Sequence, residues 1–505
     1  MILGESTRPT GSAATLDDLF RRAGVRHPDA LALADPPNRD SFADGAPRAL
    51  SFAQADRAIS AFAARLRGLG LQTDNVVALH LPNTVESIIA FLGVLRAGMI
   101  AAPMPLLWRQ REISAALGQV GAKAIVTCSR VGTSDHAKIA MQSTFELFSI
   151  RHVCSFGHDP PDGIVPLDNI FVSDAFDAVA TPSRPGVPAA HVAAVTFDLD
   201  ASGFVPVWRS HATLVAGGLE IFLEAGAATD APSLSTIPIT SFVGIALTLM
   251  PWLLSGGPCH LHHGFDRDAL AAQSSQAPDC TIVLPATTVP AVSDAGLLGP
   301  KQTVVALWRA PERFPVANTW TAASPLVDVA NFGEIGFIAV RRGESGLPAP
   351  IPLGAVNSSS RGDGLPPAIE TTRTNAGTLA LRGGMVPVRP GVSEGQPAHS
   401  DLTGVGYVDT GFACQPGRDG QTLIITAPPP GTISVGGYCF RQSQIDALAA
   451  QVDPAATLVA LPDGDLGHRL AGNSLNLPAL QALDGSVFNP LILRAFQRRG
   501  APEAA

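Results

Sequence analysis

Two short apolar segments separated by a helical pattern most constrain what this chain can fold into. Residues 76–81 and 99–102 each have the apolar character of a buried strand. Between them, apolar residues recur at helical spacing over 85–95, with Asn83 as the expected helix cap and Gly98 as the expected stop. Strands and helices that alternate at this length predict a mostly parallel sheet with helices on both faces. We therefore expect an α/β fold.

The length and charge of the chain narrow its class further. A chain of 505 residues can form two or three domains with a large core, and 46% apolar residues against 15% charged ones favour a globular protein. The formal net charge of −9 excludes the basic footprint of a nucleic-acid-binding protein. Only three lysines occur beside 31 arginines, so any site that needs an ammonium group has few candidates.

The compartment is predicted from cysteines and hydropathy. The six cysteines lie far apart with no Cys-x-x-Cys spacing, which favours a reduced cytoplasmic protein. The first residues lack the basic and apolar regions of a signal peptide. The longest apolar run, residues 241–254, is too short to span a bilayer and indicates a buried helix.

Residues 197–211 combine the small residues of a phosphate-binding loop with acidic ones. Such a loop works through small residues, free backbone N–H groups and a cation, and here Ser202 and Gly203 are of the right kind. Asp198 and Asp200 would repel a polyphosphate at the same place, and no lysine follows them. The segment therefore has the outline of a phosphate loop without most of its chemistry.

Arg209 is the cation nearest to this segment, and two interpretations of it stay open. Its guanidinium, which is always charged, can take the place of the missing lysine as a phosphate ligand. Otherwise it is an exposed arginine that precedes Ser210, the expected cap of a helix running toward residue 225.

The order of these segments resembles that of the adenylate-forming superfamily, which includes the AMP-binding enzymes and acyl-CoA synthetases. Leu81-Pro82-Asn83 through Gly98 to Pro103 matches that family's opening subdomain, and the resemblance continues over roughly residues 15–500. It implies a large N-terminal domain of layered sheets and helices, residues 1–427, and a shortened C-terminal α+β domain, residues 428–505.

The resemblance also implies a chemistry for which several side chains are missing. Family members activate a carboxylate with ATP and Mg²⁺, form an acyl-adenylate and pass the acyl group to a thiol such as CoA. Besides the loop lysine, the ribose-binding aspartate is replaced by Phe412, the ribose-binding arginine by Pro428, and the C-terminal lysine by Leu491. Removing one preorganised donor costs roughly 3–4 kcal/mol of transition-state stabilisation, so we expect no catalytic residue here.

The same resemblance implies that some residues of the family's nucleotide- and metal-binding motifs are retained. Phe332 and Gly333 match the motif that stacks on adenine, and Glu334 matches its metal-binding carboxylate, unless Glu334 is only a polar residue at a turn. The candidate cofactor-binding residues are Ser202, Gly203, Arg209, Phe332 and Gly333.

These observations predict an acyl-CoA synthetase-like protein that is catalytically impaired and acts as a binding or regulatory protein, with no cofactor expected. Its expected partners are an acyl or aryl carboxylate ligand and an active paralogue or other protein. The alternative is a divergent active ligase that uses ATP, Mg²⁺ and CoA, with Arg209 and Glu334 as substitute ligands. A third hypothesis is a structural subunit beside an active paralogue.

Overall fold

The structure is a computed structural model of the 505-residue chain. It describes residues 14–172, 182, 184–200, 203–316, 319–356, 369–387, 406–452, 456–463, 467–472, 486–488 and 491.

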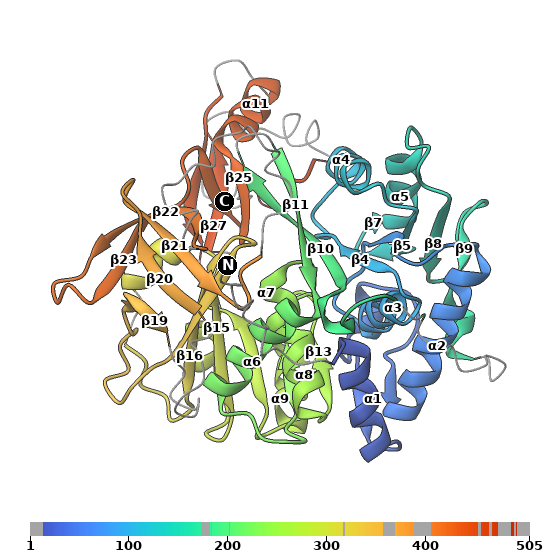
Figure 1. The fold of residues 1–505 in the computed structure, drawn as a ribbon, viewed down its shortest axis with the longest axis horizontal. Coiled ribbons are helices and arrows are strands. Elements are labelled where there is room, and N and C mark those ends of the chain that lie inside the picture. The colour runs from blue at the N-terminus through green and yellow to red at the C-terminus, as the bar shows by residue number, and fades with distance from the viewer. Residues whose placement is uncertain are drawn as a thin grey trace, which may run out of the picture.

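A seven-stranded first sheet forms one half of the large domain, at the right of Figure 1. In neighbour order its strands are β11 (Gly203–Ser210), β10 (Val192–Asp200), β4 (Ile100–Pro103), β3 (Val76–Leu79), β5 (Ala124–Cys128), β8 (His152–Phe156) and β9 (Val165–Pro166). All neighbours are parallel except β10 and β11, which form an antiparallel hairpin. The expected parallel sheet is thus confirmed.

An eight-stranded second sheet faces the first. In neighbour order its strands are β17 (Gly336–Arg341), β16 (Leu326–Phe332), β15 (Thr303–Trp308), β14 (Thr281–Pro285), β12 (Ser233–Ser235), β13 (Cys259–Leu261), β1 (Leu31–Ala34) and β2 (Ala49–Ser51). Its central strands β12 to β16 and β1 run parallel, and the two edge strands are antiparallel. Ligand sites in such sheets lie at the carboxyl ends of the strands.

Helices fill the space between the sheets and cover their outer faces. The inner helices are α1 (Leu16–Arg26), α2 (Phe52–Gly68), α3 (Val85–Arg96), α6 (His211–Ala225), α7 (Phe242–Gly244), a π-helical turn (Ile245–Leu249) and α8 (Met250–Ser255). The outer ones are α4 (Gln110–Val120), α5 (His136–Thr144), α9 (Arg267–Gln276) and α10 (Val289–Asp294). Val77 and Leu79 of β3 face the inner core, whereas Val76 and Ala78 pack with α4. This alternation is the side-chain period of a strand covered on both faces.

The expected helix over 85–95 is confirmed as α3, but Asn83 does not cap it. The N-cap residue is Thr84, and the Val85 N–H donates to Oδ1 of the buried Asp35 at 2.7 Å. The Asn83 amide instead donates to the carbonyls of Ser235 and His262, both at 3.0 Å. The prediction was wrong because the carboxylate of Asp35, just after β1, takes the cap, and Asn83 ties the start of α3 to the second sheet.

A six-stranded antiparallel third sheet completes the large domain, at the left of Figure 1. In neighbour order its strands are β18 (Ile351–Pro352), β23 (Thr422–Ala427), β22 (Val408–Pro416), β21 (Thr378–Gly383), β20 (Ile369–Arg373) and β19 (Gly354–Val356). The division predicted between residues 427 and 428 coincides with the end of β23.

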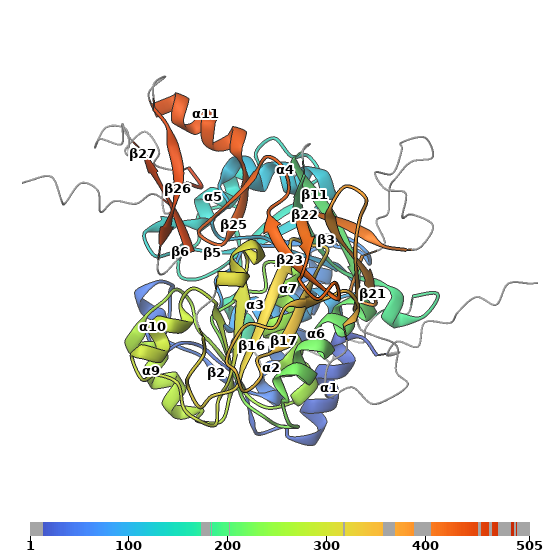
Figure 2. The same cartoon turned by 90° about the vertical axis from the view of Figure 1, so that its left-hand side faces the viewer.

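The C-terminal segment folds into a small domain with its own core. It contains the hairpin β24 (Thr432–Val435) and β25 (Tyr438–Arg441), helix α11 (Gln442–Val452), and the hairpin β26 (Leu458–Asp463) and β27 (Gly467–Gly472). Its apolar cluster includes Leu107 of the large domain, so the two domains share a buried contact. Figure 2 shows the small domain above the side of the second sheet that carries α9 and α10.

Two glycines let the small domain approach the large one closely. A Cβ on Gly437 would lie 3.1 Å from Cδ of Arg309, and one on Gly467 would lie 3.1 Å from Cγ2 of Thr287. Both glycines have positive φ, at 77° and 78°, which larger residues rarely adopt. Both turns therefore rest on the carboxyl ends of β14 and β15. Among the described residues, no helix has the length and apolar character needed to cross a membrane.

Three inner helices are joined by one buried arginine. Arg96, at the end of α3, is fully buried and donates to Asp17 of α1 at 2.7 Å and to the Ser60 hydroxyl of α2 at 2.8 Å. It also contacts the Asp56 carboxylate at 2.7 Å. Removing one partner of such a pair leaves a buried charge without compensation.

We predict that Arg96→Ala lowers the free energy of unfolding by about 3–5 kcal/mol, because Asp17 stays buried without its buried cation and keeps only the partly exposed Arg21. Urea denaturation followed by circular dichroism measures this loss. The control is Arg21→Ala, since Arg21 contacts the same Asp17 with its side chain 41% exposed, and it should change the free energy by at most about 1 kcal/mol. Equal losses in the two variants would contradict the role given to Arg96.

Candidate functional site

The segment predicted to resemble a phosphate loop is the end of a regular hairpin. Strands β10 and β11 pair residue by residue through Asp198–Val205 and Leu199–Phe204 to Asp200–Gly203. Antiparallel pairing uses backbone N–H groups that a phosphate-binding loop would leave free. Ser202 lies outside the described residues, and its predicted role stays a prediction. Gly203 has a φ of 135° and lies beside the guanidinium of Arg441 from the small domain.

A small cavity, here called the hairpin pocket, lies between this hairpin, the second sheet and the small domain. Its volume is about 110 Å³. Three carboxylates line it, those of Glu112, Asp198 and Glu334, and the guanidinium that lines it belongs to Arg309. Pockets for drug-sized ligands have volumes of roughly 300–1,000 Å³. The hairpin pocket is thus small and lined by more acidic than basic groups.

The two central carboxylates of the hairpin pocket are held by backbone groups. Asp198 accepts from the N–H of Leu199 at 2.9 Å and from that of Glu334 at 3.3 Å. Glu334 is buried, and its Oε2 accepts from the Phe242 N–H at 2.9 Å, at the start of α7. Burial raises the pKa of the Glu334 carboxyl, and the neighbouring Asp198 raises it further, against the opposing effect of Arg209. Glu334 therefore ties the second sheet to α7.

The predicted metal role of Glu334 has little support from its neighbours. Among the described residues, no group of three or more histidine, cysteine, aspartate or glutamate side chains is placed to hold a metal ion. Magnesium is usually bound through one or two carboxylates together with substrate phosphates. The Glu334 carboxylate already caps α7, so its metal role stays a prediction.

Arg209 points into the protein core rather than toward the hairpin pocket. It is fully buried and donates to the carbonyl of Met385 at 3.0 Å and to the carbonyl of Glu334. Its guanidinium lies 3.6 Å from the ring centroid of Phe242. Burial lowers the pKa of Arg209 to about 10. The arginine thus joins β11, β16–β17, α7 and the loop after β21, and its binding role stays a prediction.

The two residues matched to adenine binding are placed differently. Phe332 is fully buried, and its ring packs edge-to-face against Phe412 at a centroid distance of 5.4 Å. Phe412 stands where the resemblance expects a ribose-binding carboxylate, so an aromatic contact replaces a polar one. Gly333 lines the hairpin pocket, and a Cβ there would lie 2.9 Å from Oδ1 of Asp198. Only Gly333 of this pair faces open space.

Leu491, at the place of the family's lysine, belongs to the core of the small domain. It is 3% exposed and clusters with Val435, Phe440 and Phe488. A Cβ on Gly436 would lie 2.4 Å from Cδ2 of Leu491. The side chain therefore packs under the turn between β24 and β25, away from solvent.

The sequence analysis missed Arg309, which follows β15 directly. It lines the hairpin pocket, and its guanidinium lies 6.0 Å from the ring centroid of Tyr438 in the small domain. Among the described residues it forms no ion pair. Arg309 could have been predicted from its position directly after an apolar strand, because parallel sheets place ligand-binding groups at the carboxyl ends of their strands.

Comparisons with known proteins agree with this fold. Residues 20–194 match the family of AMP-binding enzymes. The chain is 29% identical over 178 residues to salicyl-AMP ligase / salicyl-S-ArCP synthetase of Mycobacterium tuberculosis, covering 35% of this chain and 30% of the relative. It is 37% identical over 131 residues to 4-hydroxyphenylalkanoate adenylyltransferase of Mycobacterium marinum, covering 25% and 21%. The matches thus span less than a third of each relative's length.

The structural comparison extends over nearly the whole chain. The amide bond synthetase McbA of Marinactinospora thermotolerans superposes with a TM-score of 0.67 at 18% identity, covering 94% of each chain. The resemblance to the adenylate-forming superfamily is confirmed, and the chain has that superfamily's fold. The family match ends at residue 194, before the end of the β10–β11 hairpin.

His211, just after this hairpin, is a buried neutral histidine. Its Nδ1 accepts from the Leu16 N–H at 3.3 Å and so joins the start of α6 to the start of α1. Burial lowers the pKa of His211 to about 4, and the nearby cations Arg184 and His191 add to this effect. The unfolded chain binds a proton at this residue below about pH 6.5, whereas the folded protein does not until about pH 4. Its stabilising contribution is therefore lost as the pH falls through that window.

We predict that the wild-type protein loses about 2 kcal/mol more unfolding free energy than His211→Asn between pH 7 and pH 5. The asparagine oxygen can still accept from Leu16 but cannot be protonated in this range. Urea denaturation at a series of pH values measures the unfolding free energy of each protein. Its slope against pH is then compared between wild type and His211→Asn. The control is His158→Asn at an exposed histidine, which should leave the wild-type slope unchanged. Parallel slopes for wild type and His211→Asn would contradict the prediction.

Proposed function

We propose that this chain is an acyl-CoA synthetase-like protein that does not form acyl-adenylates and acts as a binding or regulatory protein. The observation that carries the proposal is the hairpin pocket, with a volume of about 110 Å³ and a lining of Glu112, Asp198 and Glu334 against Arg309. A nucleoside triphosphate needs more room than this and cations rather than carboxylates around its phosphates.

The backbone N–H groups of the hairpin and the guanidinium of Arg209 already form contacts inside the protein, which supports the same proposal. The hairpin uses its backbone in strand pairing down to Asp200 and Gly203. The Arg209 guanidinium donates to two carbonyls in the core and has no face on the hairpin pocket. Catalysis of phosphoryl and adenylyl transfer depends on preorganised donors that face the developing charge. The residues that line the hairpin pocket therefore do not fit Mg·ATP, and no catalytic step with Mg·ATP follows from them.

The replaced positions also support a scaffold role. Phe412 packs on Phe332, and Leu491 packs inside the small domain, so each replacement now serves the fold. In this proposal the domain division at residues 427 and 428 is kept, and the protein is cytoplasmic. It binds an acyl or aryl carboxylate, or associates with an active paralogue. The names of its relatives fit this ligand class, since one is a salicyl-AMP ligase and another a 4-hydroxyphenylalkanoate adenylyltransferase.

A second candidate function is a divergent active ligase that uses ATP, Mg²⁺ and CoA. The observation that favours it is Arg309, which lines the hairpin pocket beside Gly437 of the small domain and forms no ion pair with the described residues. A shift of the small domain would enlarge the space beside it, since that domain supplies Tyr438, Cys439 and Phe440 to the lining. In this candidate Arg309, rather than the buried Arg209, replaces the lost lysine.

We predict that the purified protein catalyses no ATP–pyrophosphate exchange above background with a panel of aryl and acyl carboxylates. We also expect no saturable heat when Mg·ATP is titrated into it in a calorimeter, because the pocket is small and acidic. An active adenylate-forming enzyme assayed in parallel shows that the conditions support exchange. Carboxylate-dependent exchange by this chain would refute the proposal and establish the ligase.

Two arginine variants separate the candidates. We predict that Arg209→Ala lowers the free energy of unfolding by about 1–3 kcal/mol, because two buried carbonyls lose their donor. Arg309→Ala should leave stability within about 1 kcal/mol, since its guanidinium forms no ion pair among the described residues. If the chain is an active ligase instead, Arg309→Ala weakens Mg·ATP binding measured by calorimetry. Loss of such binding on a stable Arg209→Ala protein would restore Arg209 as the phosphate ligand.

A further inference from the structure

A second cavity, here called the tryptophan groove, has no counterpart in the sequence analysis. It lies along the outer face of β14, β15 and β16, and its volume is about 690 Å³. Helix α10 forms one wall, and the turns of the small domain at Gly437 and Gly467 close one end. The volume falls within the range of roughly 300–1,000 Å³ that is typical of small-molecule sites.

The groove exists because the connection between two parallel strands lacks a full helix. Parallel neighbours such as β15 and β16 are usually joined by a helix that covers the sheet. In the described part of this connection there is only the 3₁₀ helix η5 (Pro311–Val316). At this sheet face Trp308 and Leu326 line the groove.

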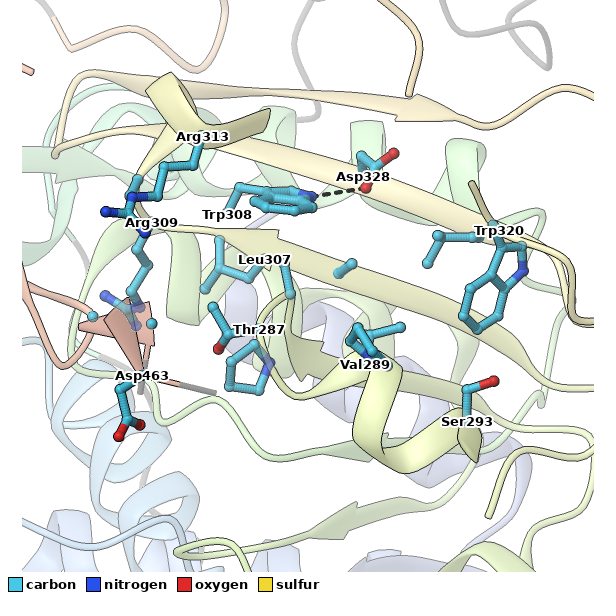
Figure 3. A pocket seen from close by; sticks show the side chains of 18 of the residues that line it. Thr287, Val289, Ser293, Leu307, Trp308, Arg309, Arg313, Trp320, Asp328 and Asp463 are labelled. Carbon is cyan, nitrogen blue, oxygen red and sulfur yellow. Dashed lines mark hydrogen bonds between the residues drawn. The ribbon is translucent and has the colours of Figure 1, made fainter. Parts of the chain in front are cut away.

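The indole N–H groups and the buried carboxylate of the groove wall are already paired within the protein. Nε1 of Trp308 donates to Oδ1 of Asp328 at 2.8 Å, and Arg342 donates to Oδ2 of the same carboxylate at 2.6 Å. Nε1 of Trp320 donates to the carbonyl of Ser324 at 2.7 Å. The indoles thus offer their apolar rings to the groove, and the buried carboxylate is neutralised. Figure 3 shows Trp308 between Arg309 and Arg313 at one end and Trp320 at the other.

The charges of the groove differ between its two ends. Arg309 and Arg313 lie together near the small domain, as Figure 3 shows, and among the described residues neither forms an ion pair. Asp463 at the same end is paired with Arg469 at 2.8 Å. His468 is largely buried, and burial lowers the pKa of its imidazole, so it adds no charge near neutral pH. This end therefore presents two guanidinium groups, and the Glu312 carboxyl interacts electrostatically with one of them, that of Arg313.

The opposite end and the rim limit how much negative charge a ligand can carry. Asp294, at the end of α10, is exposed and lines the groove with Ser293. A polyanion that filled the groove would place charge near this carboxylate, whereas a single anionic group can lie at the arginine end alone. Flat rings pack well on indoles, and arginines bind carboxylates and similar anions in a planar fork.

From this complementarity we propose that the tryptophan groove binds an amphiphilic organic monoanion, with its flat apolar body along Trp308 and Trp320 and its anionic head at Arg309 and Arg313. This inference does not depend on whether the chain forms acyl-adenylates. Arg313 and both tryptophans line the groove but not the hairpin pocket. Loss of binding at one cavity can thus be separated from loss at the other.

Two probes with the same ring system test the proposal. 8-Anilinonaphthalene-1-sulfonate has a flat body and one negative charge, and N-phenyl-1-naphthylamine has the same body without the charge. We expect the sulfonate to bind with a stoichiometry of one site per chain, and Arg313→Glu to weaken it by about tenfold or more. The affinity of the neutral amine should change by less than about twofold in Arg313→Glu, because this probe has no charged group to contact the arginine.

Ser293→Phe, which places a ring in the groove from α10, should weaken both probes by about tenfold or more. The matched control is Arg22→Glu, the same charge change at an exposed arginine of α1, which should leave both affinities unchanged. Arg313 is exposed, so its replacement should not disturb folding. If Arg313→Glu nevertheless unfolds at a lower temperature than wild type, Arg313→Gln replaces it and should also weaken sulfonate binding. Equal sulfonate binding by wild type and Arg313→Glu, undiminished binding by Ser293→Phe, or no binding by wild type would each overturn the proposal.

Discussion

The architecture of the large domain depends on burying α3 from every side. All of its residues from Val85 to Arg96 are buried, so both its faces must be covered by apolar partners. The two parallel sheets stack on either side of this layer of helices, and Arg96 satisfies its charge through Asp17 instead of reaching solvent. This stacking brings the carboxyl ends of the strands, the β10–β11 hairpin and the small domain to one region. Both cavities lie there as a result.

Within that region, several polar groups of the kind that bind ligands form contacts that stabilise the fold. Glu334 caps α7, Arg209 bridges carbonyls in the core, and the hairpin pairs its own backbone. Each of these groups contacts a partner inside the protein, and these contacts stabilise the arrangement. A larger cavity lies on the outer face of the second sheet, where Trp308 and Trp320 line a groove together with two arginines. Two cavities that meet at Arg309 thus differ in size and in charge.

Local patterns predicted β3, α3 and β4 of the first sheet because periodicity and turn residues decide them within a few residues. The Ser210 cap of α6 was confirmed for the same reason. The sequence could not predict the burial of Arg209, since its acceptors lie 125 and 176 residues away. Asn83 was assigned the wrong contact because Asp35, which follows the distant strand β1, accepts from the N–H at the start of the helix. A site built by distant segments leaves no local pattern.

The packing of Leu491 has an evolutionary consequence. Because its side chain fills the small domain under Gly436, a lysine at this position would have to be buried within an apolar cluster. Desolvation would then disfavour the charged ammonium that adenylate chemistry requires. If the chain is inactive as proposed, replacing Leu491 with lysine would thus harm folding before it could support any turnover. An apolar side chain that the surrounding core has come to need can in this way oppose the charged residue that the reaction would need at the same position.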